Sequence, residues 1–195
     1  MIKKRTRLSP HKRRMQLLDS AAAIILERGM SSLTMESVAV KANVSNPLIY
    51  KYFDSRIALL RELLIREYKV YIDDNEAEIT KHDDFQDAIY GIVKNNFDEF
   101  EKYDILNILK SQPDVRGAAV DFEEEEVLRI GRIIIKLVLK SYDISEENAI
   151  LAVIMGSGAS KDAAERYRNF GGDKEKMISS VIQFINGGVE RLSNS

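Results

Sequence analysis

Several residue types are rare or missing in this chain of 195 residues, and each gap excludes a class of site. The sequence has no cysteine, which rules out disulfides and thiolate metal ligands and is compatible with a reducing compartment. The two histidines, His11 and His82, lie in charged stretches and share no metal-ligand or nucleophile–base spacing with a carboxylate. We therefore expect no catalytic residues, no metal and no cofactor, and we interpret the chain as a protein that is not an enzyme.

Proline and long apolar runs are scarce as well. Three prolines and the lack of alternating β-branched segments favour an all-α fold. No segment approaches the ~18 consecutive apolar residues of a membrane span, and the basic start MIKKRTRLSPHKRR lacks the apolar stretch of a secretory signal. We expect a cytoplasmic protein with no membrane partner.

Charge is distributed unevenly along the chain. Residues 1–56 contain eleven Lys and Arg against four Asp and Glu, whereas the remainder contains eighteen against twenty-seven. A basic segment joined to an acidic body is typical of a protein that binds nucleic acid at one end, because neutralised phosphates supply much of the affinity. Candidates for contacts by an N-terminal arm are Arg5, Arg7, Lys12 and Arg13, although solvated charges are the simpler interpretation of each one alone.

Residues 34–53 have the pattern of two short helices joined by a turn. Thr34 is a suitable N-cap, and apolar residues follow at helical spacing, namely Met35, Val38, Ala39 and Ala42. Asn43 stands at the turn, where Asn tolerates the left-handed conformation. Ser45 or Asn46 then caps a second helix with Pro47 in its first turn. We predict a helix-turn-helix over about residues 34–53.

The second of these helices has two faces. We expect Ile49, Tyr50 and Phe53 to pack inward. The outer face carries polar, basic, aromatic and apolar side chains, namely Asn46, Pro47, Leu48, Lys51 and Tyr52. Such a face suits a DNA major groove, where Asn binds base edges, an apolar group contacts a thymine methyl, and Lys and Tyr bind phosphates. From periodicity alone, an ordinary helical hairpin of a bundle explains the segment equally well.

An amphipathic helix precedes this segment, with a start signal at Ser9-Pro10 and a stop at Gly29. Its predicted inward stripe consists of Leu18, Ala21, Ala22, Ile25 and Leu26. Roughly residues 12–64 resemble the N-terminal domain of the tetracycline-repressor (TetR) family. The shared pattern is Val44-Ser45-x-x-x-Ile49-Tyr50-x-Tyr52-Phe53, followed by Asp54-Ser55-Arg56 and Leu59-Leu60. This chain departs from the family at three positions. It has Asn43 where Gly is common, Tyr52 where His is frequent and Arg56 where Lys is more usual.

The resemblance implies a three-helix DNA-binding domain over residues 1–54 and a helical effector-binding and dimerisation domain over residues 55–195. Its implied base contacts are Asn46, Pro47, Leu48 and Tyr50, its phosphate contacts are Thr34, Lys51, Tyr52 and Arg56, and Ser45 belongs to the same DNA-binding set. A small-molecule effector is also implied. The aromatic residues that are candidates for lining its pocket, although core packing is the commoner role, are Tyr68, Tyr71, Tyr90, Phe97, Phe100, Tyr103 and Phe122.

Helical patterns continue through residues 55–195. A helix over 55–72 is predicted to connect the two domains and to end at the charged stretch 73–76. Further helices are expected from Asp83 or Asp84 to about 102, over 105–109, and from about Val115 or Ala118 to 141, with a break at Gln112-Pro113. The last two, over 145–160 and 173–192, are apolar, and the resemblance implies that they form half of an intermolecular four-helix bundle. The interface residues we predict are Val153, Gly156, Ser160, Ile178, Ile182, Ile185 and Val189, although these could instead complete the core of the monomer.

The patterns predict an all-α protein that binds DNA, and the resemblance implies a homodimeric repressor that binds a palindromic operator in double-stranded DNA and is released by an unidentified small molecule. The competing interpretation is an all-α ligand-binding or protein-interaction adaptor without sequence-specific DNA binding. The division of charge and the Ser45–Phe53 pattern favour the DNA-binding interpretation.

Overall fold

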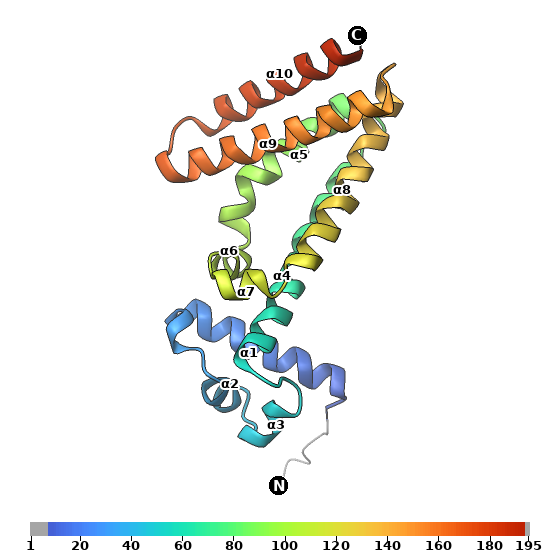
Figure 1. The fold of residues 1–195 in the computed structure, drawn as a ribbon. Coiled ribbons are helices and arrows are strands. Elements are labelled where there is room, and N and C mark those ends of the chain that lie inside the picture. The colour runs from blue at the N-terminus through green and yellow to red at the C-terminus, as the bar shows by residue number, and fades with distance from the viewer. Residues whose placement is uncertain (1–7, 194–195) are drawn as a thin grey trace. The chain divides into compact units, whose positions relative to one another are not determined.

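The computed structural model describes residues 8–193, apart from the side chain of Phe100, and in this range it contains ten α-helices, one short 3₁₀ helix and no strand (Figure 1). The all-α prediction is confirmed. No helix in the described range has the length and apolar character needed to cross a membrane. By their internal contacts the described residues form two units, unit 1 over 8–68 and 104–120, and unit 2 over 69–103 and 121–193. This grouping by contact differs from the division at residue 54, which remains a prediction about function.

Unit 1 begins with α1 (Pro10–Arg28), whose limits follow from its end residues. The Ser9 hydroxyl accepts a hydrogen bond from the Lys12 N–H at 3.3 Å, and Gly29 ends the helix with a φ of 80°. The predicted inward stripe needs one correction, because Leu26 is 55% exposed. The apolar side chains that α1 buries are Leu17, Leu18, Ala21, Ile24 and Ile25. The buried face therefore includes Leu17 and Ile24, directly before the predicted Leu18 and Ile25, and leaves out Leu26.

Three short elements follow α1 and complete the helix-turn-helix. They are the 3₁₀ helix η1 (Met30–Ser32), α2 (Met35–Lys41) and α3 (Asn46–Tyr50). Helix α2 packs against α1, and α3 packs against α2. Unit 1 also contains α6 (Asp104–Lys110) and α7 (Pro113–Gly117), so the proline predicted to interrupt the chain also begins a new helical turn.

The helix α4 (Arg56–Thr80) contributes to both units and is longer than predicted. The prediction that it ends at residues 73–76 is wrong. Asp74 accepts hydrogen bonds from Lys102 and Tyr103, and Glu76 pairs with Arg129, so neighbouring cations neutralise the acidic stretch and the helix continues through it.

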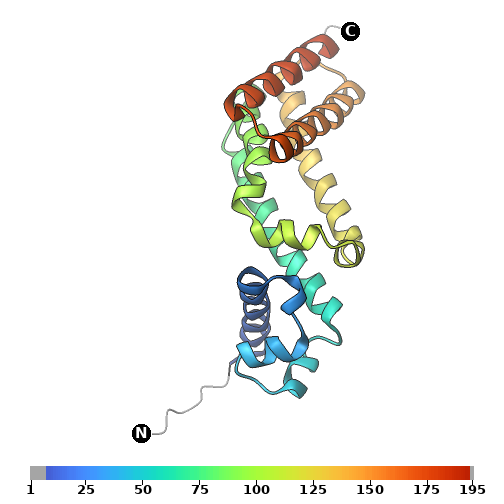
Figure 2. The same cartoon turned by 90° about the vertical axis from the view of Figure 1, so that its left-hand side faces the viewer.

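Unit 2 is built from α5 (Phe85–Lys102), α8 (Val120–Ser141), α9 (Glu146–Phe170) and α10 (Lys174–Ser193), together with the second half of α4. The helices α9 and α10 lie side by side, and α5 packs against both (Figures 1 and 2). Apolar side chains of all five helices form its core, among them Ile79, Phe97, Val138, Val153 and Val189.

This core overturns most of the predicted dimer interface. Six of the seven residues are buried within a single chain, namely Val153, Gly156, Ser160, Ile178, Ile185 and Val189, and Ile182 is half-buried. A Cβ on Gly156 would lie 3.4 Å from Ile185, and the Ser160 hydroxyl accepts a hydrogen bond from Asn96 at 2.8 Å. The most regular apolar stripes of α9 and α10 therefore face each other and α5, which is the core-packing alternative.

Candidate functional site

The start of α2 is fixed by a reciprocal pair of hydrogen bonds. The Thr34 hydroxyl accepts from the Ser37 N–H at 3.0 Å, and the Ser37 hydroxyl accepts from the Thr34 N–H at 2.9 Å. Thr34 is thereby confirmed as the N-cap, and its side chain is exposed. Sequence reasoning missed Ser37, although the Thr-x-x-Ser spacing is the signal for it.

The turn between α2 and α3 has the predicted conformation. Asn43 has a φ of 54°, which is the left-handed region. A further contact, which the sequence did not indicate, ties this turn to α1. The Gln16 side-chain amide donates to the Ala42 carbonyl at 3.0 Å, and its oxygen accepts from the Arg13 guanidinium at 2.6 Å. The first helix thus acts as a scaffold that holds the turn in place.

The helix α3 presents one face to the core and another to solvent. Ile49 is 0% and Phe53 is 2% exposed, as predicted for the inner face. Tyr50 was expected to pack inward and does not, because it is 46% exposed. Phe53, which follows the turn after α3, and Ile49, four residues earlier, occupy the inner face, and Tyr50 points about 100° away from Ile49. Asn46 and Pro47 are exposed beside it, after Ser45, which begins the helix without a side-chain hydrogen bond.

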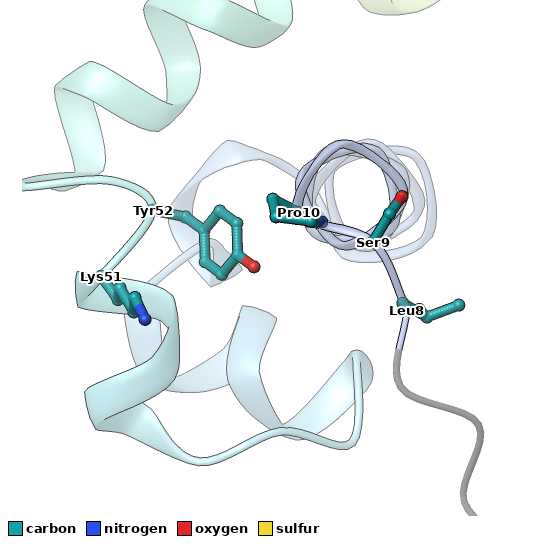
Figure 3. A pocket seen from close by; sticks show the side chains of 5 residues that line it. All are labelled: Leu8, Ser9, Pro10, Lys51 and Tyr52. Carbon is teal, nitrogen blue, oxygen red and sulfur yellow. The ribbon is translucent and has the colours of Figure 1, made fainter.

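A hollow of about 440 Å³ lies where the end of α3 approaches the beginning of α1 (Figure 3). Its lining residues are Leu8, Ser9, Pro10, Lys51 and Tyr52. The first turn of α1 contains no acidic residue, so the partial positive charge of the helix N-terminus is not neutralised there. A helix N-terminus, an ammonium group and a phenol hydroxyl around one hollow suit an anion such as a DNA phosphate.

Two other cations of this region have carboxylate partners in the protein, Lys41 and Arg14. Lys41 pairs with Glu27 at 2.6 Å, and the hydrogen bond between them lowers the pKa of Glu27. Arg14 pairs with Glu62 at 2.6 Å, and this hydrogen bond raises the pKa of the Arg14 guanidinium. Among the described residues, the Lys51 side chain has no ion-pair or hydrogen-bond partner, so its exposed ammonium is available to a phosphate.

The Arg56 guanidinium donates to the carbonyls of Leu33 and Met30, so the structure gives it partners other than a phosphate. Arg5 and Arg7 lie outside the described residues. Lys12 is exposed.

The described aromatic residues among those predicted to line an effector pocket line neither the hollow of about 440 Å³ nor the smaller hollow of unit 2. Tyr68 belongs to unit 1 and the others to unit 2. Tyr71 and Tyr103 meet edge to face with ring centroids 5.4 Å apart, and Phe97 is buried with its ring 5.8 Å from that of Tyr167. Tyr90 is 47% exposed, and the Phe122 ring lies under the Lys69 ammonium at 5.7 Å. The side chain of Phe100 lies outside what the structure describes.

Unit 2 contains a smaller hollow that sequence reasoning missed. It has a volume of about 280 Å³ and lies between the end of α4 and α8. Its apolar lining residues are Ile79, Ile133 and Leu137, and its polar ones are Thr80, His82, Lys136 and Lys140. These residues come from segments more than 50 positions apart, so their proximity has no local sequence signal.

Comparisons with known proteins agree with this geometry. Residues 17–63 match the family model of bacterial regulatory proteins of the tetR family. The chain is 24% identical over 194 residues to the HTH-type transcriptional activator FasR of Mycolicibacterium smegmatis, covering 95% of this chain and 87% of FasR. It is 29% identical over 85 residues to the probable acrEF/envCD operon repressor of Escherichia coli K12, covering 43% of this chain and 39% of that protein.

The fold has solved counterparts too. The fatty acid degradation regulator FadR from Bacillus halodurans superimposes with a TM-score of 0.64 at 17% identity, covering 92% of this chain and 96% of FadR. With the exposed face of α3, the capped start of α2 and the family match over the same residues, the chain is a DNA-binding transcriptional regulator of the TetR family.

Proposed function

We propose that this regulator acts in the cytoplasm as a homodimeric repressor that binds a palindromic operator through α3. The observation that carries the proposal is the exposed face of α3 beside the anion-suited hollow. The base contacts are assigned to Asn46, Pro47, Leu48 and Tyr50. The phosphate contacts are assigned to Thr34, Lys51 and Tyr52. Ser45, directly before α3, belongs to the same DNA-binding set.

A homodimer is supported by the outward faces of α9 and α10. Their exposed apolar side chains are Leu151, Ile154, Met155 and Phe184, with exposed fractions of 43%, 63%, 53% and 66%. Cβ atoms added to Gly187 or Gly188 would meet nothing within 4 Å, so the backbone there is open to close approach. We assign the dimer contact to this outward face in place of the buried residues predicted from the sequence. A two-fold dimer presents two copies of α3, which explains why the operator would be palindromic.

Repression needs only that the protein occupy its operator, and the release of the operator by a small molecule would then switch transcription on. We place the effector in the hollow of unit 2, because an apolar lining with Lys136 beside it suits an amphipathic anion such as a medium-chain carboxylate. A ligand lowers operator affinity only by the difference between its affinities for the bound and released conformations.

The decisive experiment selects genomic DNA fragments with the purified protein and measures the affinity of the recovered operator against salt. A palindromic fragment bound by a dimer is the expected result. If the protein retained no fragment above random background, DNA regulation by this chain would be excluded. Adding decanoate should weaken operator binding, and Lys136→Glu should abolish that response; an unchanged response in the variant would exclude the effector site.

Substitutions on α3 separate the two kinds of contact. Lys51→Ala should weaken operator and random DNA alike and reduce the salt slope by about 1.8, since each lost phosphate contact contributes ~0.9 and a dimer loses two. Asn46→Ala should cost about 1–3 kcal/mol on the operator and change base preference. Arg132→Ala removes an exposed charge from α8, outside the assigned dimer face, and serves as the control. Equal losses on operator and random DNA for both α3 variants would refute the assignment.

A further inference from the structure

Arg56 is the first residue of α4, and its guanidinium holds the segment that leads into α2. Its Nε donates to the Leu33 carbonyl at 2.8 Å, and its Nη2 donates to the Met30 carbonyl at 3.3 Å. The Met30 carbonyl also accepts the N–H of Leu33 at 3.2 Å. The Arg56 side chain therefore joins the start of α4 to the first residue of η1, Met30, and to the residue that follows η1, Leu33.

The Leu33 carbonyl stands directly before Thr34, the residue that caps α2. Leu33 is 2% exposed and precedes Thr34, whose hydroxyl caps the helix and is assigned to a phosphate. At the other end of the link, the Ser55 hydroxyl accepts a hydrogen bond from the Ala58 N–H at 3.1 Å and fixes the first turn of α4. The position of Thr34 is thus set from α4 through the Leu33 carbonyl.

We propose that Arg56 is a positioning residue for DNA binding, which holds Thr34 and the start of α2 against the first turn of α4, and that it is not a phosphate contact. The inference rests on the proposed function, because it assigns a role within operator binding. A guanidinium is required, since Nε and Nη2 point to two acceptors from one rigid plane, whereas a lysine offers a single nitrogen on a flexible stem. This chain has arginine at position 56, where lysine is more usual in the TetR family that the segment resembles.

The test compares Arg56→Lys and Arg56→Ala with Lys51→Ala on two probes, the operator fragment recovered from genomic DNA and a random duplex of the same length. Arg56→Lys keeps the charge and should still weaken operator binding about ten- to hundredfold, with the salt slope of the wild type. Lys51→Ala should instead lower the slope by about 1.8. Wild-type affinity in Arg56→Lys, or a slope in Arg56→Ala that falls as it does in Lys51→Ala, would overturn the proposal.

Amide hydrogen exchange supplies an arm that does not depend on DNA. The Ser37 amide, which is bonded to the Thr34 hydroxyl, should exchange faster in Arg56→Lys, while the amides of Leu18 and Ala21 in α1 keep their protection. Unchanged protection at Ser37 would overturn the proposal. If Arg56→Ala did not fold, the lysine variant would still decide the matter. If the wild-type protein bound no operator, the proposed function would fail, and exchange at Ser37 would still show whether Arg56 fixes the start of α2.

Discussion

Replacing Phe184 with glutamate is expected to convert the regulator from a dimer to a monomer. The Phe184 ring is 66% exposed on α10, and the assigned dimer face also includes the exposed Ile154 and Met155 of α9. A Phe side chain offers ~200 Å² of surface, so roughly 130 Å² remains to be buried by a partner. At about 25 cal/mol per Å² this amounts to ~3 kcal/mol for each protomer and ~6 kcal/mol for a symmetric dimer.

That loss corresponds to a dimer dissociation constant about 10⁴-fold larger, before the cost of burying two carboxylates is added. Sedimentation velocity over a range of protein concentrations measures it directly. Ser179→Glu adds the same charge to an exposed position of α10 that lies about 140° around the helix from Phe184, and it should remain dimeric. A Phe184→Glu protein that sediments as the wild type does would refute the assignment of this face.

The operator supplies an independent readout of the same substitution. A monomer retains its α3 contacts to one half-site but loses the added affinity of the second, so Phe184→Glu should bind a half-site and the full operator with nearly equal affinity. Wild-type preference for the full operator should persist in Ser179→Glu. A wild-type protein that binds its operator as a monomer would contradict the dimer itself.

Two further substitutions probe local conformation and ionisation. Asn43→Gly should keep the stability of the wild type to within about 1 kcal/mol. Asn43→Val should lower the stability by about 1–2 kcal/mol, because a β-branched residue resists a φ of 54°. Urea unfolding compares the two variants, and equal midpoints would contradict the argument. The hydrogen bonds from Lys102 and Tyr103 lower the pKa of Asp74, so its ionised form contributes stability that is present above the ordinary Asp pKa and is lost as pH falls through the lower folded value. Asp74→Asn should flatten the pH dependence of stability below about pH 4, measured by urea midpoints, and an unaltered dependence would show that Asp74 does not contribute.

The helix-turn-helix was predictable because its signals are local. Thr34 caps α2, Asn43 adopts the left-handed turn, and Ile49 and Phe53 form an inner face, all within 20 residues. Each of these outcomes depends on backbone geometry and on neighbours at i+3 or i+4, which a sequence displays directly. Tyr50 was misplaced because an aromatic residue next to a buried position has the same local pattern whether it faces the core or DNA.

The errors elsewhere arose from contacts between distant positions. The acidic stretch of α4 continues as helix because Lys102, Tyr103 and Arg129 bind its carboxylates, and these partners are 28 to 53 positions away in the chain. The outward and inward faces of α9 are both apolar, so periodicity shows that two faces exist and does not show which one α10 covers. The buried Gly156 and the exposed Ile154 illustrate the two faces within three residues.

The structure also limits how α3 can distinguish one operator from another. The helix has five residues, and its exposed polar groups are the Asn46 amide and the Tyr50 hydroxyl, with Pro47 exposed and Leu48 half-buried between them. Two polar groups and a small apolar surface read few base edges, since each base pair is specified by bidentate or methyl contacts in the major groove. In the proposed dimer, we expect further discrimination from the energy of deforming the operator so that both copies of α3 fit, which depends on base pairs that the protein does not contact. Substitutions at such uncontacted positions should therefore change affinity through groove width and bending, in proportion to the stiffness of the step and independently of Asn46.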